Sequence, residues 1–209
     1  MPGKLTLYTN PMSRGRIARW MLEEIGEPYD TVVLAYGEEG VKSPAYRAIN
    51  PMGKVPAVTH GSRIVTEGAA ICAYLADAFP AAGLAPAPTG RADYYRWLFF
   101  AAGPLEAAVT NHAVGWDPDP DRARMFGYGS YDATVDTLDG LLSAQAYVTG
   151  ETFTAADVYV GAAVSWGLGF GTLPKRPAFE GYAARVTSRP AHKRAAALDD
   201  ALMPPKVSA

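Results

Sequence analysis

The sequence predicts an α/β domain followed by an all-helical domain. Strand and helix patterns alternate up to about residue 80. The segment 80–90 is rich in Pro, Gly and Ala, which is typical of a connection between domains. From Arg91 onward only helical periodicity is present. We therefore assign residues 1–80 to the first domain, 81–90 to a linker and 91–209 to the helical domain.

The first domain is predicted to follow the order β-α-β-α-β-β-α. Gly26 ends the first helix, and Ser43 with Pro44 begins the second. A tight turn at Gly61 and Ser62 joins the last two strands into a hairpin, whereas the first βαβ crossover implies parallel pairing. In chain order, these elements are expected at residues 4–9, 13–26, 29–34, 43–50, 54–60, 63–67 and 67–79.

Prolines and a capping pattern divide the second domain into helices. Pro118 and Pro120 separate two long helical patterns, and Pro104 is expected to kink the first of them. Thr154 and Asp157 have the spacing of a capping box at the start of the next helix. These signals predict helices at about residues 91–115, 120–146, 153–170 and 177–190, followed by a last one over 191–200.

Composition restricts the class of protein. Hydrophobic residues make up 49% and charged residues 19%, as in a soluble globular protein. The net charge of -2 shows neither the basic footprint of a nucleic-acid-binding protein nor a polybasic membrane patch. No apolar run approaches the roughly 20 residues of a membrane span, and no apolar signal segment precedes the first strand. We expect a cytoplasmic protein.

Cysteine and histidine give little sign of redox or metal chemistry. Cys72 is the single cysteine, so an internal disulfide is excluded, which fits a reducing compartment. Because Cys72 lies well inside a helix, we expect a buried apolar residue rather than a nucleophile. His60, His112 and His192 are scattered without metal-ligand spacing, so no metal is expected.

Four segments carry a family resemblance. At these spacings and in this order, they make the chain resemble the glutathione S-transferase superfamily along nearly its whole length. The resemblance best fits bacterial members with a serine in the first loop. It implies a thioredoxin-like first domain that binds reduced glutathione and a helical domain that contributes a pocket for an electrophile. The segments are "YTNPMSRGR", "NPMGKVPAV", "TEGAAICAYLAD", and "GETFTAADV" with "RVTSRPA".

The resemblance gives Pro56 a reason to stand in a strand-like segment. Proline donates no backbone hydrogen bond, so it is unusual inside a strand. In the family a cis peptide bond precedes this proline, which leaves the N–H and C=O of Val55 free to pair with glutathione as an added strand would. The alternative is a trans proline at the start of an ordinary edge strand.

The resemblance also assigns the two ends of glutathione. The N–H of Gly68, at a helix start, receives the γ-glutamyl carboxylate, and Glu67 pairs with the ammonium group. Relatives more often carry Ser or Thr at the position of Gly68, so this chain lacks a hydroxyl there. Glu67 is equally a helix-start acid that the helix dipole favours. Lys54 meets the glycyl carboxylate or is simply an exposed loop lysine.

Ser13 is the predicted donor to the glutathione sulfur. It follows the first strand and stands where the first helix begins, so that its hydroxyl and the helix dipole both favour a thiolate. The alternative is that Ser13 only caps this helix. Asn10, Tyr8 and Thr9 are competing donors. No cysteine occupies the loop, which argues against disulfide exchange of the glutaredoxin kind.

The chain is therefore predicted to be a transferase of the detoxification type that uses glutathione as co-substrate. The thiolate would attack a small hydrophobic electrophile held near His112, Trp116 and Trp166, although aromatic residues at helical spacing are also typical of a core. The resemblance implies a homodimer. The alternatives are a non-catalytic binding or stress protein with this fold, or a specialised glutathione-dependent peroxidase, isomerase or dehalogenase.

Overall fold

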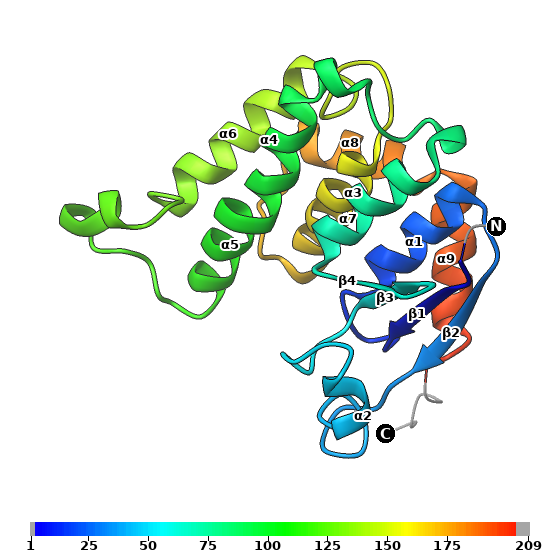
Figure 1. The fold of residues 1–209 in the computed structure, drawn as a ribbon. Coiled ribbons are helices and arrows are strands. Elements are labelled where there is room, and N and C mark those ends of the chain that lie inside the picture. The colour runs from blue at the N-terminus through cyan, green and yellow to red at the C-terminus, as the bar shows by residue number, and fades with distance from the viewer. Residues whose placement is uncertain (1–2, 204–209) are drawn as a thin grey trace. The chain divides into compact units, whose positions relative to one another are not determined.

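The computed structural model describes residues 3–203, which form two units (Figure 1). The first unit contains the chain up to Ala82 together with the segment from Arg189, and the second runs from Gly83 to Ser188. Residues 1–2 and 204–209, which the domain prediction includes, lie outside the described residues. Within the described part, no helix is long and apolar enough to cross a membrane.

The first unit is built on a mixed sheet of strand order β2-β1-β3-β4. β1 pairs with β2 in parallel, as the crossover predicts, and with β3 antiparallel. β3 and β4 form the predicted hairpin. The sequence therefore predicts both the kinds of element and their order. The strands are β1 (Leu5–Thr9), β2 (Tyr29–Val33), β3 (Ala57–His60) and β4 (Arg63–Thr66).

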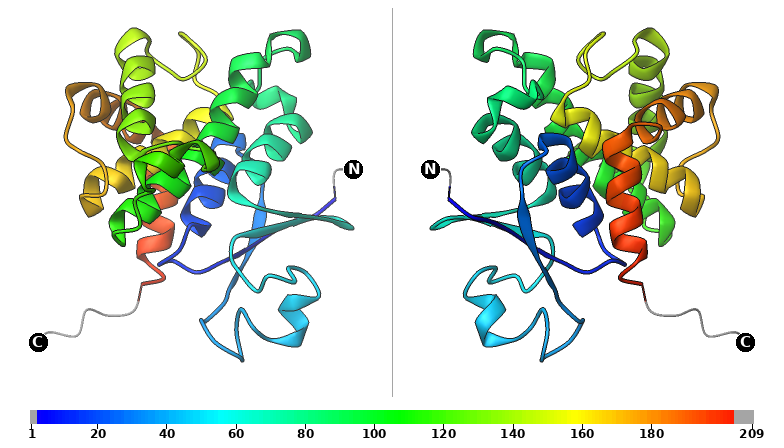
Figure 2. Two further views of the ribbon diagram at one scale, coloured as in Figure 1. Left: turned by 90° about the vertical axis from the view of Figure 1, so that its left-hand side faces the viewer. Right: turned by 90° about the vertical axis from the view of Figure 1, so that its right-hand side faces the viewer.

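Helices cover both faces of this sheet (Figure 2). α1 and α3 pack on one face, where Leu7 and Val58 are fully buried, and α2 lies beyond the other. Gly26 ends α1 in the left-handed conformation that favours glycine. Ser43 begins α2 by accepting a hydrogen bond from the N–H of Tyr46. The helices are α1 (Gly15–Ile25), α2 (Pro44–Arg47) and α3 (Gly68–Ala78), followed by a 3-10 turn, η1 (Pro80–Ala82).

The last helix, α9 (Pro190–Asp200), belongs to the first unit, although the sequence assigns it to the helical domain. It packs along α1. The buried side chains of Arg19 and Asp199 form an ion pair at 2.8 Å. Arg189 forms two hydrogen bonds of 2.7 Å with the carboxylate of Glu24. The periodicity of a helix shows that it has an apolar face but not which partner covers that face, which explains the difference.

The second unit is entirely helical in its regular structure. Pro104 falls in a π-helical turn, η3, that separates α4 from α5 at the predicted kink. The helix predicted from about residue 120 begins only at Tyr131, because Gly129 has a positive φ and Ser130 caps the next turn. The elements are η2 (Pro88–Gly90), α4 (Ala92–Phe100), η3 (Ala101–Leu105), α5 (Glu106–Ala113), η4 (Pro120–Met125), α6 (Tyr131–Ala144), α7 (Ala155–Phe170) and α8 (Pro177–Thr187).

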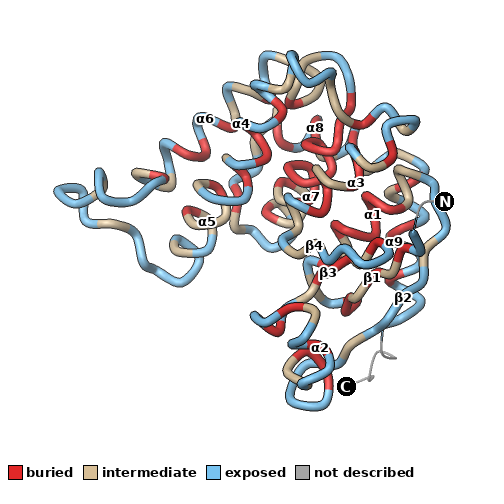
Figure 3. The backbone as a smooth tube through the Cα atoms, in the orientation of Figure 1, coloured by how far each residue is buried: buried red, intermediate tan, exposed pale blue. Residues whose placement is uncertain are grey.

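Asp157 organises the core of the second unit, where much of α7 is buried (Figure 3). Its carboxylate and Thr154 form the predicted capping box. The carboxylate also accepts hydrogen bonds from the N–H of Val148 at 2.8 Å and the hydroxyl of Tyr182 at 2.9 Å. Burial raises the pKa of this carboxyl, and the hydrogen bonds that it accepts lower the pKa in part. Asp157 thus joins α7, α8 and the preceding loop.

We expect Asp157→Ala to lower the free energy of unfolding by about 3 kcal/mol, because buried donors lose a charged acceptor. Chemical denaturation measures the change. Asp119→Ala is the matched control, because Asp119 caps η4 through one exposed bond to the N–H of Asp121. The control should cost less than about 1 kcal/mol. Equal losses in the two variants would contradict the assigned role of Asp157.

Candidate functional site

The sheet register brings four chain segments together at one end of the sheet. The end of β1 pairs with the end of β2 at Thr9 and Val33. The same end of β1 lies beside the start of β3, where Tyr8 pairs with Ala57. Ala57 in turn pairs with Thr66 at the end of β4. The loops after β1, β2 and β4 and the segment before β3 therefore meet at this end.

The loop after β1 is shaped by Asn10. Its side-chain oxygen accepts a hydrogen bond from the N–H of Met12 at 2.9 Å, which closes an Asx turn. Its amide nitrogen donates to the carbonyl of Leu34, beyond β2, at 2.8 Å. Both polar atoms of the buried Asn10 side chain are thus already bonded to backbone. This geometry gives Asn10 a part in building the loop.

The segment before β3 repeats this turn at Asn50. The side-chain oxygen accepts from the N–H of Met52 at 3.1 Å, and the amide nitrogen donates to the carbonyl of Lys54 at 2.7 Å. Both turns have the sequence Asn-Pro-Met. Sequence reasoning missed this structural part of Asn50, and the repeated tripeptide is the signal that could have revealed it.

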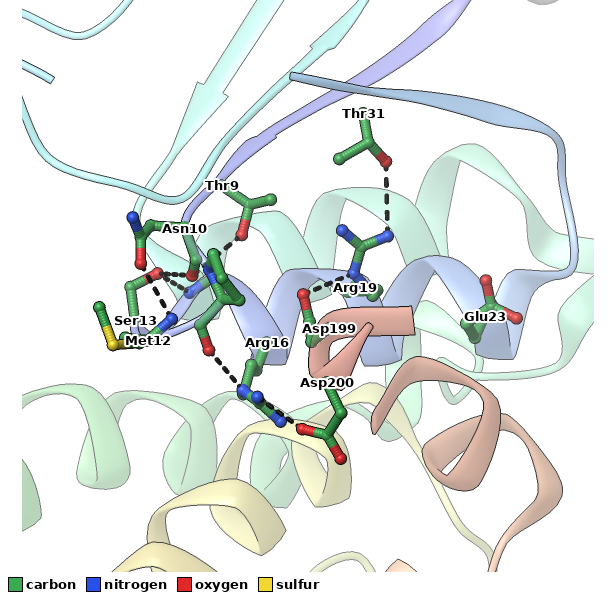
Figure 4. Close-up of polar contacts among 12 residues, drawn as sticks. Thr9, Asn10, Met12, Ser13, Arg16, Arg19, Glu23, Thr31, Asp199 and Asp200 are labelled. Atoms are coloured by element: carbon green, nitrogen blue, oxygen red, sulfur yellow. Dashed lines mark hydrogen bonds and ion pairs between the residues drawn. The ribbon is translucent and has the colours of Figure 1, made fainter. Parts of the chain in front are cut away.

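Ser13 lies between the loop and α1, as Figure 4 shows. Its hydroxyl donates to the carbonyl of Asn10 at 2.7 Å and accepts from the N–H of Gly15, the first residue of α1, at 2.9 Å. The half-buried Ser13 therefore satisfies an unpaired N–H of the first helical turn, as a capping residue does. The same oxygen is polarised by that N–H, which suits a donor to an anion.

The guanidinium of Arg16 is hydrogen-bonded to other parts of the chain, whereas an arginine in a first helical turn is usually solvated. Its Nε donates to the carbonyl of Pro11 at 2.6 Å, and its Nη2 pairs with the carboxylate of Asp200 on α9 at 2.7 Å (Figure 4). The next carbonyl, that of Met12, accepts from the hydroxyl of Tyr36 at 3.2 Å. Side chains of two residues outside the loop, Arg16 and Tyr36, thus donate hydrogen bonds to the consecutive carbonyls of Pro11 and Met12.

The peptide bond between Val55 and Pro56 is cis. Within the described residues, neither the N–H nor the C=O of Val55 takes part in a hydrogen bond. The preceding carbonyl, that of Lys54, accepts from the hydroxyl of Tyr46 and from Asn50, both at 2.7 Å. Burial raises the pKa of Tyr46 to about 12, so its hydroxyl stays protonated as a donor at neutral pH. The bonds to the Lys54 carbonyl thus hold this segment in place, and the N–H and C=O of Val55 are available to a ligand.

Glu67 begins α3 in an unusual conformation. Its φ of 65° makes it the only described non-glycine residue with a positive φ. A non-glycine residue in this conformation costs about 1–3 kcal/mol, and such strained residues cluster at active sites and ligand-binding positions. The side chain is exposed and makes no capping hydrogen bond. The first helical hydrogen bond runs from the N–H of Ile71 to the carbonyl of Glu67, and the N–H of Gly68 has no hydrogen-bond partner among residues 3–203.

Tyr8 and Lys54 occupy different surroundings from Ser13. The ring of Tyr8 lies 5.7 Å from that of Tyr46, in an apolar cluster with Val41. Because strand residues alternate between faces, Tyr8 lies on the face opposite the buried Leu7, which packs towards α1. Lys54 is exposed, and no ion-pair partner for it lies among the described residues.

The predicted electrophile-pocket residues all lie in the second unit. His112 stacks on the ring of Tyr131, with centroids 3.8 Å apart, and its Nδ1 lies 2.9 Å from the carboxylate of Asp117. Trp116 is 73% exposed, whereas Trp166 on α7 is half-buried. Among the described residues, no ring contact joins Trp166 to the other two. Their part in binding an electrophile stays a prediction.

Comparisons with known proteins show what this chain is similar to. A sequence model of the glutathione S-transferase N-terminal domain matches residues 12–78, which contain the loop of Ser13, the Val55 segment and the start of α3. The glutathione transferase of Methylococcus capsulatus has a similar structure, with a TM-score of 0.75 and 25% identity over 94% of this chain and 99% of its own. Residues 12–78 therefore match the N-terminal domain of glutathione S-transferases, and the described chain is similar in structure to members of that superfamily. Its first unit has the thioredoxin-like fold that the resemblance implies.

Other glutathione S-transferases also have sequences or structures similar to this chain. Glutathione S-transferase GST-4.5 of Xanthomonas campestris is 27% identical over 78% of this chain and 82% of its own. The theta-class enzyme of Xanthomonas axonopodis, solved with glutathione bound, has a TM-score of 0.71 and 27% identity over 94% of this chain and 98% of its own. A sphingomonad glutathione S-transferase complexed with glutathione has a TM-score of 0.74 and 26% identity over 93% of this chain and 98% of its own.

Cys72 and possible metal ligands were the remaining candidates for chemistry in the sequence. Cys72 is fully buried in α3, and burial raises the pKa of its thiol. No group of three or more His, Cys, Asp or Glu side chains within residues 3–203 has the arrangement of a metal site.

We expect the Cys72 thiol to be unreactive towards Ellman's reagent in the folded chain and fully reactive in denaturant, because thiolate attack needs ionisation and access. Absorbance of the released thionitrobenzoate measures the extent of reaction. Glutathione reacted under the same native conditions is the control for reagent activity. Rapid native labelling of Cys72 would contradict its burial.

Proposed function

We propose that this chain is a glutathione transferase. It binds reduced glutathione at the end of the sheet, stabilises the thiolate and catalyses its attack on a small hydrophobic electrophile. The observation that carries this proposal is the convergence of three groups suited to the tripeptide: the Ser13 hydroxyl, the Val55 backbone and the start of α3 at Glu67. Bound glutathione in the structures of two relatives supports it.

Each part of glutathione has a matching group on the chain. The backbone of its cysteine pairs with the N–H and C=O of Val55 as an added strand would. The γ-glutamyl carboxylate lies at the N–H of Gly68, where the helix dipole favours an anion, and the ammonium group meets Glu67. Lys54 receives the glycyl carboxylate. Held at both ends, the tripeptide presents its sulfur to the loop of Ser13.

The thiolate needs modest stabilisation. A free thiol has a pKa near 8.5, and lowering it by about two units requires roughly 2.7 kcal/mol. A hydroxyl donor to a charged acceptor contributes about 1.5–3 kcal/mol, and a helix N-terminus adds about 0.3–1 kcal/mol. The Ser13 hydroxyl together with the start of α1 is therefore about sufficient.

The Ser13 hydroxyl must turn from the Asn10 carbonyl to the sulfur. That carbonyl also accepts from the N–H of Ser13 at 3.1 Å, so it is not left unpaired by the rotation. The bond from the N–H of Gly15 to the hydroxyl oxygen is unaffected. Exchanging a neutral hydrogen bond, worth about 0.5–1.5 kcal/mol, for a charged one still favours the thiolate.

The remaining parts of the proposal concern the setting of the reaction. The electrophile is held by the second unit near His112, Trp116 and Trp166, and the reaction serves detoxification in the cytoplasm. The single cysteine, Cys72, supports a reducing compartment. The active form is a homodimer, as is usual in the family. Light scattering that gives the mass of one chain would overturn the dimer alone.

We expect Ser13→Ala to lower turnover with a chlorodinitrobenzene-type acceptor by about tenfold, because the thiolate loses one charge-assisted hydrogen bond. The rate of conjugate formation at neutral pH measures it. Ser130→Ala is the matched control, because Ser130 also caps a helix, α6, through the N–H of Ala133. A cap-only role for Ser13 predicts a small stability loss and unchanged turnover in both variants. Unchanged turnover in Ser13→Ala with a loss in Tyr8→Phe would assign the sulfur contact to Tyr8.

We expect Glu67→Gln to raise the KM for glutathione about tenfold with kcat nearly unchanged, because the ammonium contact is equal in ground and transition states. Steady-state kinetics with varied glutathione separates the two constants. A fall in kcat at unchanged KM would contradict this placement of the ammonium group.

Calorimetry with reduced glutathione tests binding itself. Saturable binding together with turnover supports the proposal. Binding without turnover of any acceptor would favour the alternative of a non-catalytic glutathione-binding protein. Weak binding would fit that alternative too, because Gly68 lacks the hydroxyl that relatives more often have at this position. No binding at millimolar glutathione would overturn both functions.

A further inference from the structure

We propose that Asp200, on the C-terminal helix, and Arg16 are positioning residues for the thiolate site. This inference rests on the proposed function, because it concerns the loop that carries Ser13. The two residues are 184 positions apart in the chain, and their side chains meet at 2.7 Å (Figure 4). Neither side chain is among the groups proposed to bind glutathione. We therefore expect their effect on catalysis to act through the loop.

The first step is the bond from Arg16 to the loop. The guanidinium Nε donates to the carbonyl of Pro11 at 2.6 Å. Pro11 lies between Asn10, whose carbonyl accepts the Ser13 hydroxyl, and the turn that leads to Ser13. Proline has no N–H, so the carbonyl is the only backbone group of Pro11 that can be held. A charged donor at this carbonyl therefore fixes the direction in which the loop approaches α1.

The second step is the bond from α9 to Arg16. A guanidinium presents its donors in a rigid plane, so a carboxylate that binds one nitrogen sets the direction of the others. Asp200 binds Nη2 and leaves Nε directed at Pro11. The neighbouring pair of Arg19 with Asp199 is buried and anchors the same turns of α1 and α9. Asp200 thus reaches Arg16 from a fixed helix end.

The charges around this contact allow a simpler alternative. Arg14 and Arg16 follow the loop in the sequence, and on α9 Asp200 pairs with Arg16 while Asp199 pairs with Arg19. If Arg16 supplied only positive potential, lysine would replace it. If its fork must hold Pro11 and Asp200 together, lysine cannot, because a single ammonium on a flexible chain lacks the fixed geometry.

The test compares wild type, Arg16→Lys, Asp200→Asn and a control, Arg194→Gln, in glutathione kinetics. Arg194 also joins α9 to α1, through Glu23 at 3.0 Å, but does not contact the loop. We expect kcat/KM at about pH 6.5 to fall about tenfold in Arg16→Lys and about threefold in Asp200→Asn, with Arg194→Gln within about twofold of wild type. The thermal midpoints of Asp200→Asn and Arg194→Gln should fall by similar amounts.

A pH dependence separates positioning from general destabilisation. Near pH 9 the thiol ionises with little help, so the losses in Arg16→Lys and Asp200→Asn should shrink to about twofold or less. Wild-type activity in Arg16→Lys, or equal losses in Asp200→Asn and Arg194→Gln, would overturn the inference while leaving the proposed function intact. A wild-type chain that neither binds nor turns over glutathione would overturn the proposed function, and this inference with it.

Discussion

The antiparallel register between β1 and β3 is the constraint on which the site depends. Because Tyr8 pairs with Ala57, the loop after β1 lies beside the segment before β3. Parallel pairing with β2 and the hairpin with β4 then bring Leu34 and Glu67 to the same end of the sheet. A register shift of one residue would turn the buried Leu7 to the opposite face, so the packing of the core also fixes the site.

The fold could be predicted where local signals agree with the final structure. Ser43, Gly26 and the capping box at Asp157 mark helix ends through hydrogen bonds within a few residues, so the sequence determines them directly. The helix α9 was predicted near its observed place, but its packing on α1 was not, because their contacts join residues far apart in the chain. The predicted start of α6 was also too early, because Pro120 opens a short 3-10 segment, η4, whose single turns the sequence does not distinguish from the start of an α-helix.

The site was only partly predictable, because several of its supporting bonds join residues far apart in the chain. The family motifs named the residues, and the structure brings Ser13, Val55 and Glu67 to one end of the sheet. The supporting bonds, from Tyr46 to the Lys54 carbonyl and from Arg16 to that of Pro11, involve backbone atoms that no sequence pattern identifies. Ser13 precedes the N-cap residue Arg14, and its hydroxyl accepts from the N–H of Gly15 at the start of α1; its contact with the glutathione sulfur stays a prediction.

A pH titration of glutathione bound to the wild-type chain tests whether this geometry favours the thiolate. The ultraviolet absorbance of the thiolate, measured with the chain saturated, gives the pKa of the bound thiol. If the Ser13 loop and the start of α1 act together as proposed, this pKa lies about two units below the value near 8.5 of free glutathione. A bound thiol that titrates at the free value would contradict thiolate stabilisation.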